Sequence, residues 1–217
     1  MTPDLAQVLN TVAHEIRTPL AVSQGYLKLF LDGRLKEENE IRRAMEQTRQ
    51  ALGALATLCV DMGKVSTLAE SAEARGIPVR VPAPDFVTSL LAREEVQHAA
   101  FTGSTGTAAI ATASVADLAH AVAIVAKSAF DEERDEPHAI EASQGDGLLL
   151  IAGSTKALAS MSKAPDAPGA RAVDFGKGGK GLKLIWAAFV LDRHGVQTWT
   201  DDASRASVGF RIPLVQA

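Results

Sequence analysis

An apolar repeat in the first third of the chain restricts that part to long amphipathic helices. Its first run steps by alternating four and three residues, a mean period of about 3.5 that is typical of packed helices. This run consists of Leu5, Leu9, Val12, Ile16, Pro19, Ser23, Tyr26 and Phe30. Asp32-Gly33 then interrupts the pattern, as glycine does where helices end. A second run, with charged residues between its members, consists of Ile41, Met45, Thr48, Leu52, Leu55, Cys59 and Met62.

The two runs predict a helical hairpin that pairs with a second copy of itself. Two amphipathic helices joined by a short linker form an antiparallel hairpin, but a lone hairpin buries too little apolar surface to be stable. A homodimer would bury both seams in a four-helix bundle. Aromatic residues make up only 5% of the chain and alanine is abundant, a composition that favours such close helix packing.

Charge and composition exclude several classes of protein. The net charge of −4 argues against a general nucleic-acid-binding protein, which would carry a basic patch. The single cysteine, Cys59, excludes a disulfide framework and a cysteine-based zinc site. No apolar run approaches the ~20 residues that span a bilayer, and the N-terminus lacks the basic and apolar regions of a signal peptide. We therefore expect a cytoplasmic protein without a membrane segment.

After a shift in composition near Ser66–Gly76, short strand-like and helical patterns alternate to the end of the 217 residues. We therefore expect two domains, residues 1–70 and 71–217, the second of them an α+β or layered α/β unit. The expected strands are Ile77–Val81, Thr107–Thr112, Ala139–Ala142, Leu148–Ile151, Val196–Thr200 and Ser207–Pro213. The expected helices run from an N-cap at Asp85 to about Glu95, from Ser114 or Val115 to Phe130, and over Leu182–His194, with Ser160–Gly181 as a loop.

His14 is the residue of the hairpin whose position points most clearly to chemistry. It lies two residues from the repeat positions on either side, so at ~100° per residue it points away from the seam toward solvent. Glu15 can hold an imidazole proton and leave the other ring nitrogen more nucleophilic. Thr18, one turn on, can orient a water, and Pro19, which costs a helix interior roughly 3 kcal/mol, favours a local bend. The same residues are equally consistent with an exposed histidine, a surface carboxylate and an incidental kink.

Residues 14–20, His-Glu-Ile-Arg-Thr-Pro-Leu, resemble the phosphoacceptor box of bacterial two-component sensor histidine kinases, and the hairpin through about residue 68 extends the match. The resemblance implies that His14 carries a phosphoryl group on a ring nitrogen and that Glu15 assists its transfer. It implies that Thr18 positions water when the partner response regulator is dephosphorylated. The catalytic residues it assigns are His14, Glu15, Arg17, Thr18 and Pro19. The partners it implies are a second copy of the chain and a response-regulator receiver domain.

The C-terminal part resembles the ATP-binding domain of the same family. Gly176–Leu184, with the helix and final strand that follow, looks like the family's second glycine box, which implies a Bergerat-type α/β sandwich after the hairpin. A glycine loop that opens a helix presents backbone N–H groups at the positive end of the helix dipole, and this suits a phosphate. The candidate nucleotide-binding residues are Gly179, Gly181 and Leu182. Lys183 stands where the family usually has glycine.

Other nucleotide-binding residues of the family have no counterpart here. In the register of the resemblance, Ile124 and Ser128 stand where two asparagines belong, and isoleucine cannot ligate Mg²⁺, which takes oxygen ligands. The adenine-binding aspartate is also missing, because Ala152–Lys156 contains no acid. The chain's only asparagines, Asn10 and Asn39, lie in the hairpin. The sandwich is thus a degenerate ATP-binding domain, in which ATP and Mg²⁺ remain possible ligands without most of their motifs, and we assign no metal site.

Three functions fit these residues. The first is a phosphorelay protein whose His14 exchanges a phosphoryl group with a response-regulator aspartate. The second is an active sensor histidine kinase fragment with an atypical ATP pocket, which the missing asparagines and acid count against. The third is a non-catalytic pseudokinase scaffold, for which retention of the histidine box is unexpected. We expect the first.

Overall fold

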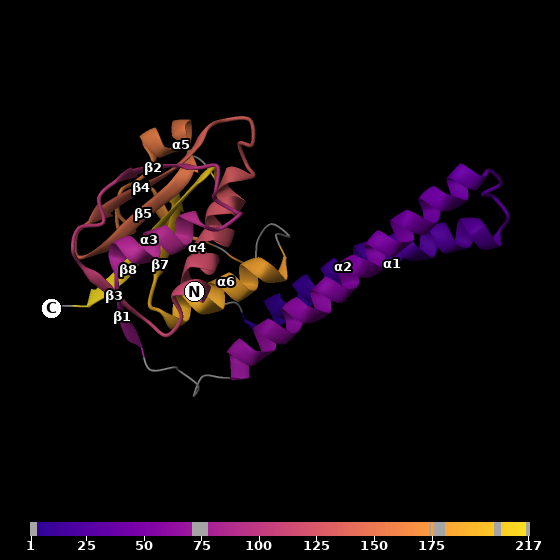
Figure 1. Ribbon diagram of the computed structural model, residues 1–217, viewed down its shortest axis with the longest axis horizontal. Helices are drawn as coiled ribbons and strands as arrows, with labels where there is room; N and C mark the ends of the chain where they lie inside the picture. The colour runs from indigo at the N-terminus through magenta and orange to yellow at the C-terminus, as the bar shows by residue number, and fades with distance from the viewer. Residues whose placement is uncertain (1–3, 71–77, 174, 176–180, 202–204, 216–217) are drawn as a thin grey trace.

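The computed structural model describes residues 4–70, 78–173, 175, 181–201 and 205–215. A long helical hairpin projects from an α/β body in these residues (Figure 1). The helices are α1 (Leu5–Leu31), α2 (Glu38–Glu70), α3 (Ala83–Leu91), α4 (Val115–Phe130), α5 (Thr155–Ser160) and α6 (Leu182–Arg193). The strands are β1 (Val79–Pro82), β2 (Ala100–Gly103), β3 (Ala109–Thr112), β4 (His138–Gln144), β5 (Gly147–Ser154), β6 (Ala170–Ala172), β7 (Gln197–Asp201) and β8 (Ser207–Val215).

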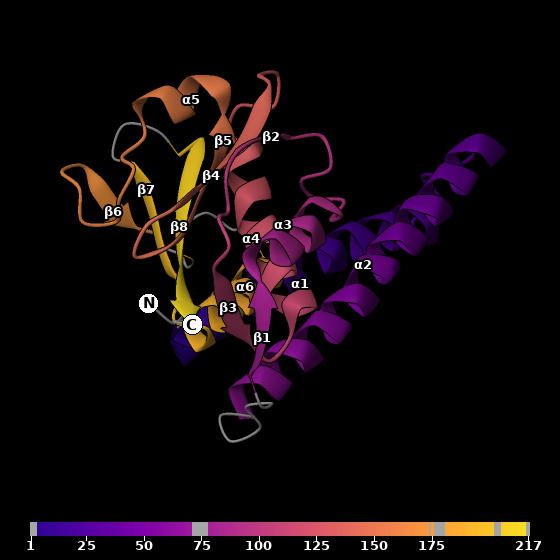
Figure 2. The ribbon, with the colours of Figure 1, turned by 60° about the vertical axis from the view of Figure 1, so that its left-hand side comes forward.

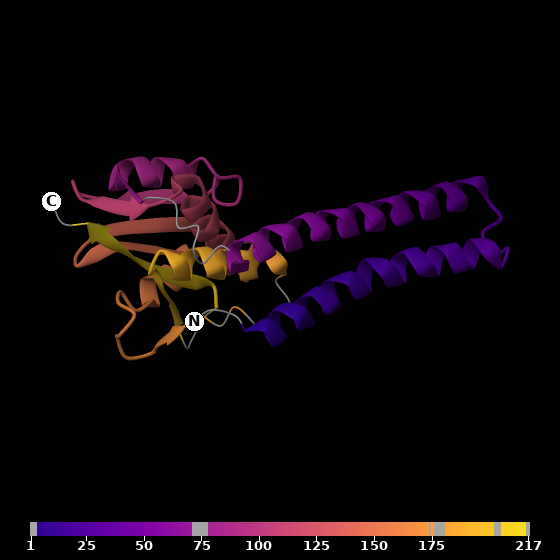
Figure 3. The same ribbon diagram turned by 90° about the horizontal axis from the view of Figure 1, so that it is seen from below.

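The hairpin forms as the sequence predicts, with α1 and α2 side by side along their length (Figure 3). Asp4 caps α1, because its carboxylate accepts from the Gln7 N–H at 2.7 Å while its own N–H donates to the Gln7 side chain at 3.1 Å. This reciprocal capping fixes where the helix begins. At the other end Gly33 has a φ of +64°, the left-handed conformation that ends the helix.

In the single chain the predicted seam of α2 is only partly covered, with Ile41, Thr48 and Leu55 half-buried. Among the side chains of this helix that the structure describes, the buried ones include small alanines and are Ala44, Ala51, Leu58 and Val65. The predicted seam residues Met45 and Leu52 are 61% and 54% exposed, and Cys59 and Met62 are exposed as well. Small side chains let two helices approach closely, so the alanines face α1 and the larger repeat residues face outward. The hairpin therefore carries a second apolar face that the single chain leaves uncovered.

The α/β body is a sandwich of one twisted sheet and helices, which confirms the predicted order of a hairpin followed by an α/β sandwich. The main path of the sheet runs β1-β3-β8-β5-β4-β2, and β7 pairs with β8 and β6 with β7. The β2–β4 pair is parallel and the other pairs are antiparallel. α3, α4 and α6 cover the face nearer the hairpin, and α5 covers the opposite face (Figure 2).

Most of the predicted elements of the sandwich occur within a few residues of their predicted bounds, but the first helix differs. Asp85 is not its N-cap: α3 begins at Ala83 after Pro82, lacks a side-chain cap, and ends at Leu91. Two prolines at the start supply the helical φ without a capping side chain. β2, β6 and α5 were not predicted, because each is six residues or fewer and has no clear apolar period.

The hairpin and the sandwich are joined through α6. Leu58 and Val65 of α2 form a buried cluster with Leu182 and Ile185 of α6, and apolar residues of α1 pack against its edge. This cluster brings the N-terminal end of α6 to the flank of α1 that carries His14. Among the described residues, no helix combines the length and the apolar character needed to cross a membrane.

Candidate functional site

The imidazole of His14 is exposed on the flank of α1, where the helical phase of the sequence places it. Arg17 and Thr18, three and four residues further along the same helix, are exposed too. His14 and Thr18 share one face of the helix because they are separated by about one turn. In the single chain the imidazole is therefore open to solvent.

Within the box, Ile16 packs against the apolar cluster around Leu182, and the carboxylate of Glu15 contacts the sandwich. The Glu15 carboxylate lies against Gly181, so close that a Cβ on residue 181 would collide with it. Gly181 is the N-cap of α6 and has a φ of +90°, a conformation that side chains rarely adopt. The positive end of the α6 dipole thus faces a carboxylate next to the phosphoacceptor candidate.

Pro19 lies half-buried inside α1, which continues through it to Leu31. The proline cannot donate to the carbonyl of Glu15. Any local effect of this lost hydrogen bond falls on the turn that carries His14 and Glu15. Sequence and structure thus place the proline one turn beyond the histidine, on the side of α1 that packs in the hairpin.

The predicted nucleotide loop is only partly within the described residues. Gly179 lies outside them, whereas Gly181 and Leu182 are described. The side chain of Leu182 is buried against Leu58 and Val65 of the hairpin. This side chain holds the sandwich on the hairpin, which leaves only the backbone of residues 181 and 182 to face a ligand.

The residues that the resemblance places at the family's magnesium position do not fit a magnesium ion. Ile124 offers no oxygen, and the hydroxyl of Ser128 donates to the Val125 carbonyl at 2.7 Å. No group of three or more His, Cys, Asp or Glu side chains placed to hold a metal occurs in the part of the chain that the structure describes.

The end of β5, where the resemblance leads one to expect an adenine-binding acid, has a structural role here. Ser154 is buried, donates its hydroxyl to the Glu133 carboxylate and accepts from the Ala157 N–H at 3.0 Å. It therefore caps α5, which packs on the sheet face away from α4 and α6.

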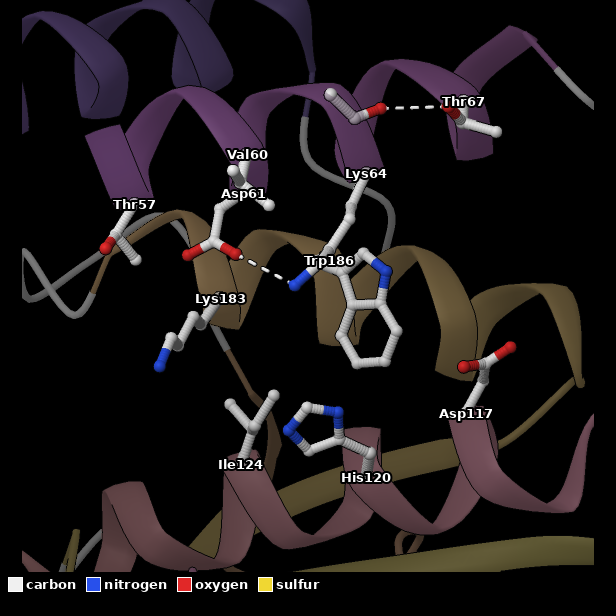
Figure 4. Close-up of a pocket in the computed structure, with 11 residues that line it drawn as sticks. Thr57, Val60, Asp61, Lys64, Thr67, Asp117, His120, Ile124, Lys183 and Trp186 are labelled. Atoms are coloured by element: carbon white, nitrogen blue, oxygen red, sulfur yellow. Dashed lines mark hydrogen bonds and ion pairs between the residues drawn. The ribbon is translucent and has the colours of Figure 1, made fainter. Parts of the chain in front are cut away.

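A pocket that the sequence did not predict lies between α2, α4 and α6, with a volume of about 780 Å³ (Figure 4). His120, Ile124, Lys183 and Trp186 line one side of it, and Lys64 belongs to the hairpin side. Only Ile124 and Lys183 stood out in the sequence, as departures from the family pattern. The contribution of α2 could not be foreseen, because it depends on how the hairpin packs on the sandwich.

Comparisons with known proteins agree with this architecture. Residues 4–63 match the His Kinase A (phospho-acceptor) domain family. A search among curated proteins by sequence finds no match.

Among solved structures, the Acinetobacter baumannii histidine kinase AdeS is similar with a TM-score of 0.53 and 14% identity, over 94% of this chain and 98% of that one. Histidine kinase ThkA, solved in complex with the response regulator protein TrrA, is similar with a TM-score of 0.62 and 15% identity. The match covers 97% of this chain and 62% of that one. Full-length ShkA in complex with AMPPNP is similar with a TM-score of 0.56 and 18% identity. The match covers 100% of this chain and 47% of that one. The chain thus spans about half to two thirds of the length of the last two.

The chain therefore contains a His Kinase A phospho-acceptor domain and has, over nearly its whole length, the fold of sensor histidine kinases.

Proposed function

We propose that this protein is a phosphorelay component whose His14 exchanges a phosphoryl group with the aspartate of a response-regulator receiver domain. The observation that carries the proposal is the exposed His14 in an intact acceptor box, beside a sandwich whose magnesium position holds Ile124. The acceptor residues are thus present, whereas Ile124 offers no oxygen at the position where the resemblance places a magnesium ligand.

In the proposed transfer, one ring nitrogen of His14 attacks the phosphorus of the aspartyl phosphate. The bond from phosphorus to the aspartate oxygen breaks, and the carboxylate leaves. The proton on the other ring nitrogen is held by a base, and Glu15 is the carboxylate beside the ring in sequence. Arg17 and Thr18 lie exposed on the same flank, where they can contact the phosphoryl group or the receiver.

We further propose that the working unit is a homodimer. The uncovered apolar face of the hairpin includes Leu27 of α1 with 57% of its surface exposed, besides Met45 and Leu52 of α2. Exposed apolar rows on two adjacent helices fit a second copy of the same hairpin in a four-helix bundle. The two-domain division at residues 1–70 and 71–217 fits this arrangement, with the bundle built from the first domain alone.

The experiment that tests the function starts from receiver domains phosphorylated with a radiolabelled small-molecule phosphodonor. The wild-type protein is expected to take up acid-labile label, and His14→Ala to take up none. The matched variant His98→Ala, which changes an exposed histidine of the sandwich, is expected to take up label as the wild type does. Labelling of His14→Ala at the wild-type rate would contradict the assignment.

A further inference from the structure

We propose that the pocket between α2, α4 and α6 binds a small planar aromatic molecule that carries an anionic group, without a metal ion. Its volume of about 780 Å³ lies within the ~300–1,000 Å³ usual for small-molecule sites. One wall comes from the hairpin helix α2 and the other from α4 and α6 (Figure 4). An occupant would therefore touch the hairpin and the sandwich at once.

The side chains of the sandwich wall make a surface suited to a flat ring. The rings of His120 and Trp186 contact each other with centroids 5.2 Å apart and planes inclined by 52°. Ile124 lies one turn along α4 from His120, and all three side chains are half-buried. Glu95 accepts from or ion-pairs with His120 Nε2 at 3.2 Å, which holds the imidazole in place. Half-buried aromatic faces of this kind gain from stacking a planar ligand.

The charge in the pocket favours an anion at one end. Lys183 stands in the first turn of α6, where the helix dipole adds positive potential, and it has no ion-pair partner among the described residues. Lys64, by contrast, is paired with Asp61 at 3.2 Å. Lys183 is therefore the cation left to meet an anionic group. Asp61 and Asp117, which also line the pocket, can accept hydrogen bonds from ring N–H groups.

Two departures from the family pattern converge on this pocket. Ile124 replaces an asparagine expected to hold magnesium, and Lys183 replaces a glycine of the nucleotide loop. Ile124 supplies apolar surface, and Lys183 supplies a positive charge where a metal ion would otherwise do so. The same substitutions that do not fit magnesium thus fit an aromatic anion. This inference does not depend on the role of His14.

Binding is tested on the full chain by isothermal titration and by tryptophan fluorescence, in buffer that contains EDTA. The probes are 1-naphthoate, AMP and the neutral 1-naphthalenemethanol. We expect saturable binding of at least one anionic probe, quenching of the tryptophan signal, and at least tenfold weaker binding of the neutral probe. Tighter binding of 1-naphthoate would indicate an aromatic carboxylate as the natural class, and tighter binding of AMP a nucleoside monophosphate.

Variants connect the binding to the pocket. Lys183→Gln is expected to weaken binding of the anionic probe at least threefold and to leave binding of the neutral probe unchanged. Ile124→Asn is expected to weaken binding of the anionic probe and of the neutral probe. The matched control Lys156→Gln, in an exposed lysine of α5 on the other face of the sheet, should leave binding unchanged. The proposal is overturned if no probe binds saturably, if binding requires Mg²⁺, if the neutral probe binds as tightly as the anions, or if Lys183→Gln binds like the wild type.

Discussion

The carboxylate of Glu15 lies against Gly181, at the point where the N-terminus of α6 meets the flank of α1. The residue beside the phosphoacceptor candidate is thus held by the sandwich and not by the hairpin alone. A Cβ at position 181 would displace either the carboxylate or the helix end. The contact gives the sandwich a defined place next to the candidate phosphoacceptor, His14.

Gly181→Ala is therefore expected to slow phosphoryl uptake by His14 roughly tenfold or more, because small displacements of an assisting group are costly. The measurement is the initial rate of labelling from a phosphorylated receiver. Gly195→Ala is the matched control, since Gly195 ends the same helix with a φ of +65° and a Cβ there would meet only Pro213 at an ordinary 3.6 Å. Both variants lose about 1–3 kcal/mol of stability from backbone strain. Equal rates in the two variants would show that the Glu15 contact has no role in transfer.

Leu52→Glu is expected to convert the proposed dimer to a monomer. A charge at a residue that the bundle buries is strongly unfavourable unless it is paired, and sedimentation at micromolar concentration measures the result. Val60→Glu is the control, because Val60 is 59% exposed on the same helix but points into the pocket between α2 and the sandwich. A wild-type protein that sediments as a monomer would rule out the four-helix bundle.

Ile185→Ala is expected to destabilise the protein by about 2–4 kcal/mol in urea unfolding, because it removes a buried side chain from the cluster that joins α6 to the hairpin. Asp192→Ala, an exposed position on the same helix, should change stability by less than ~0.5 kcal/mol. A small effect of Ile185→Ala would mean that the hairpin and the sandwich are not packed together in solution.

The Arg49 guanidinium hydrogen-bonds the exposed Glu46 carboxylate at 2.7 and 2.8 Å and lowers the pKa of that carboxyl to about 2, with help from Gln50. Since the pKa is lower in the folded chain, this contact stabilises α2 above the unfolded pKa of about 4.5, and its contribution is lost as the pH falls toward 2. An NMR titration of the carboxyl carbon should find the low midpoint. Arg49→Ala should return the midpoint to the ordinary range, and an unchanged midpoint in that variant would assign the shift to another cause.

The sequence predicts the elements that have strong local signals. The 3.5-residue repeat yields the hairpin, α4 spans Val115–Phe130 as expected, and Gly195 follows the end of α6. The burial of Ala44 and Ala51 within the single chain was not predicted, because alanines are weak apolar signals beside Met45 and Leu52. Which face of a helix lies inside depends on the fit of side chains between two helices, and small residues allow the closer fit.

The candidate site likewise has features that a local sequence pattern predicts and features that depend on contacts between distant parts of the chain. The exposure of His14 followed from its helical phase alone. The contact between Glu15 and Gly181 joins residues 166 positions apart in the chain, and no local pattern predicts it. The pocket of Trp186 and Lys64 likewise requires the hairpin and the sandwich to be in place.

The central claim is that His14 receives its phosphoryl group from a receiver domain and not from ATP. The most direct measurement is mass spectrometry under neutral conditions of two parallel reactions, one with a phosphorylated receiver and one with Mg²⁺-ATP. We expect one phosphoryl group on the peptide that contains His14 in the first reaction and none in the second. Phosphorylation of His14 by Mg²⁺-ATP in the absence of any other kinase, or its absence after incubation with every phosphorylated receiver tested, would contradict the account.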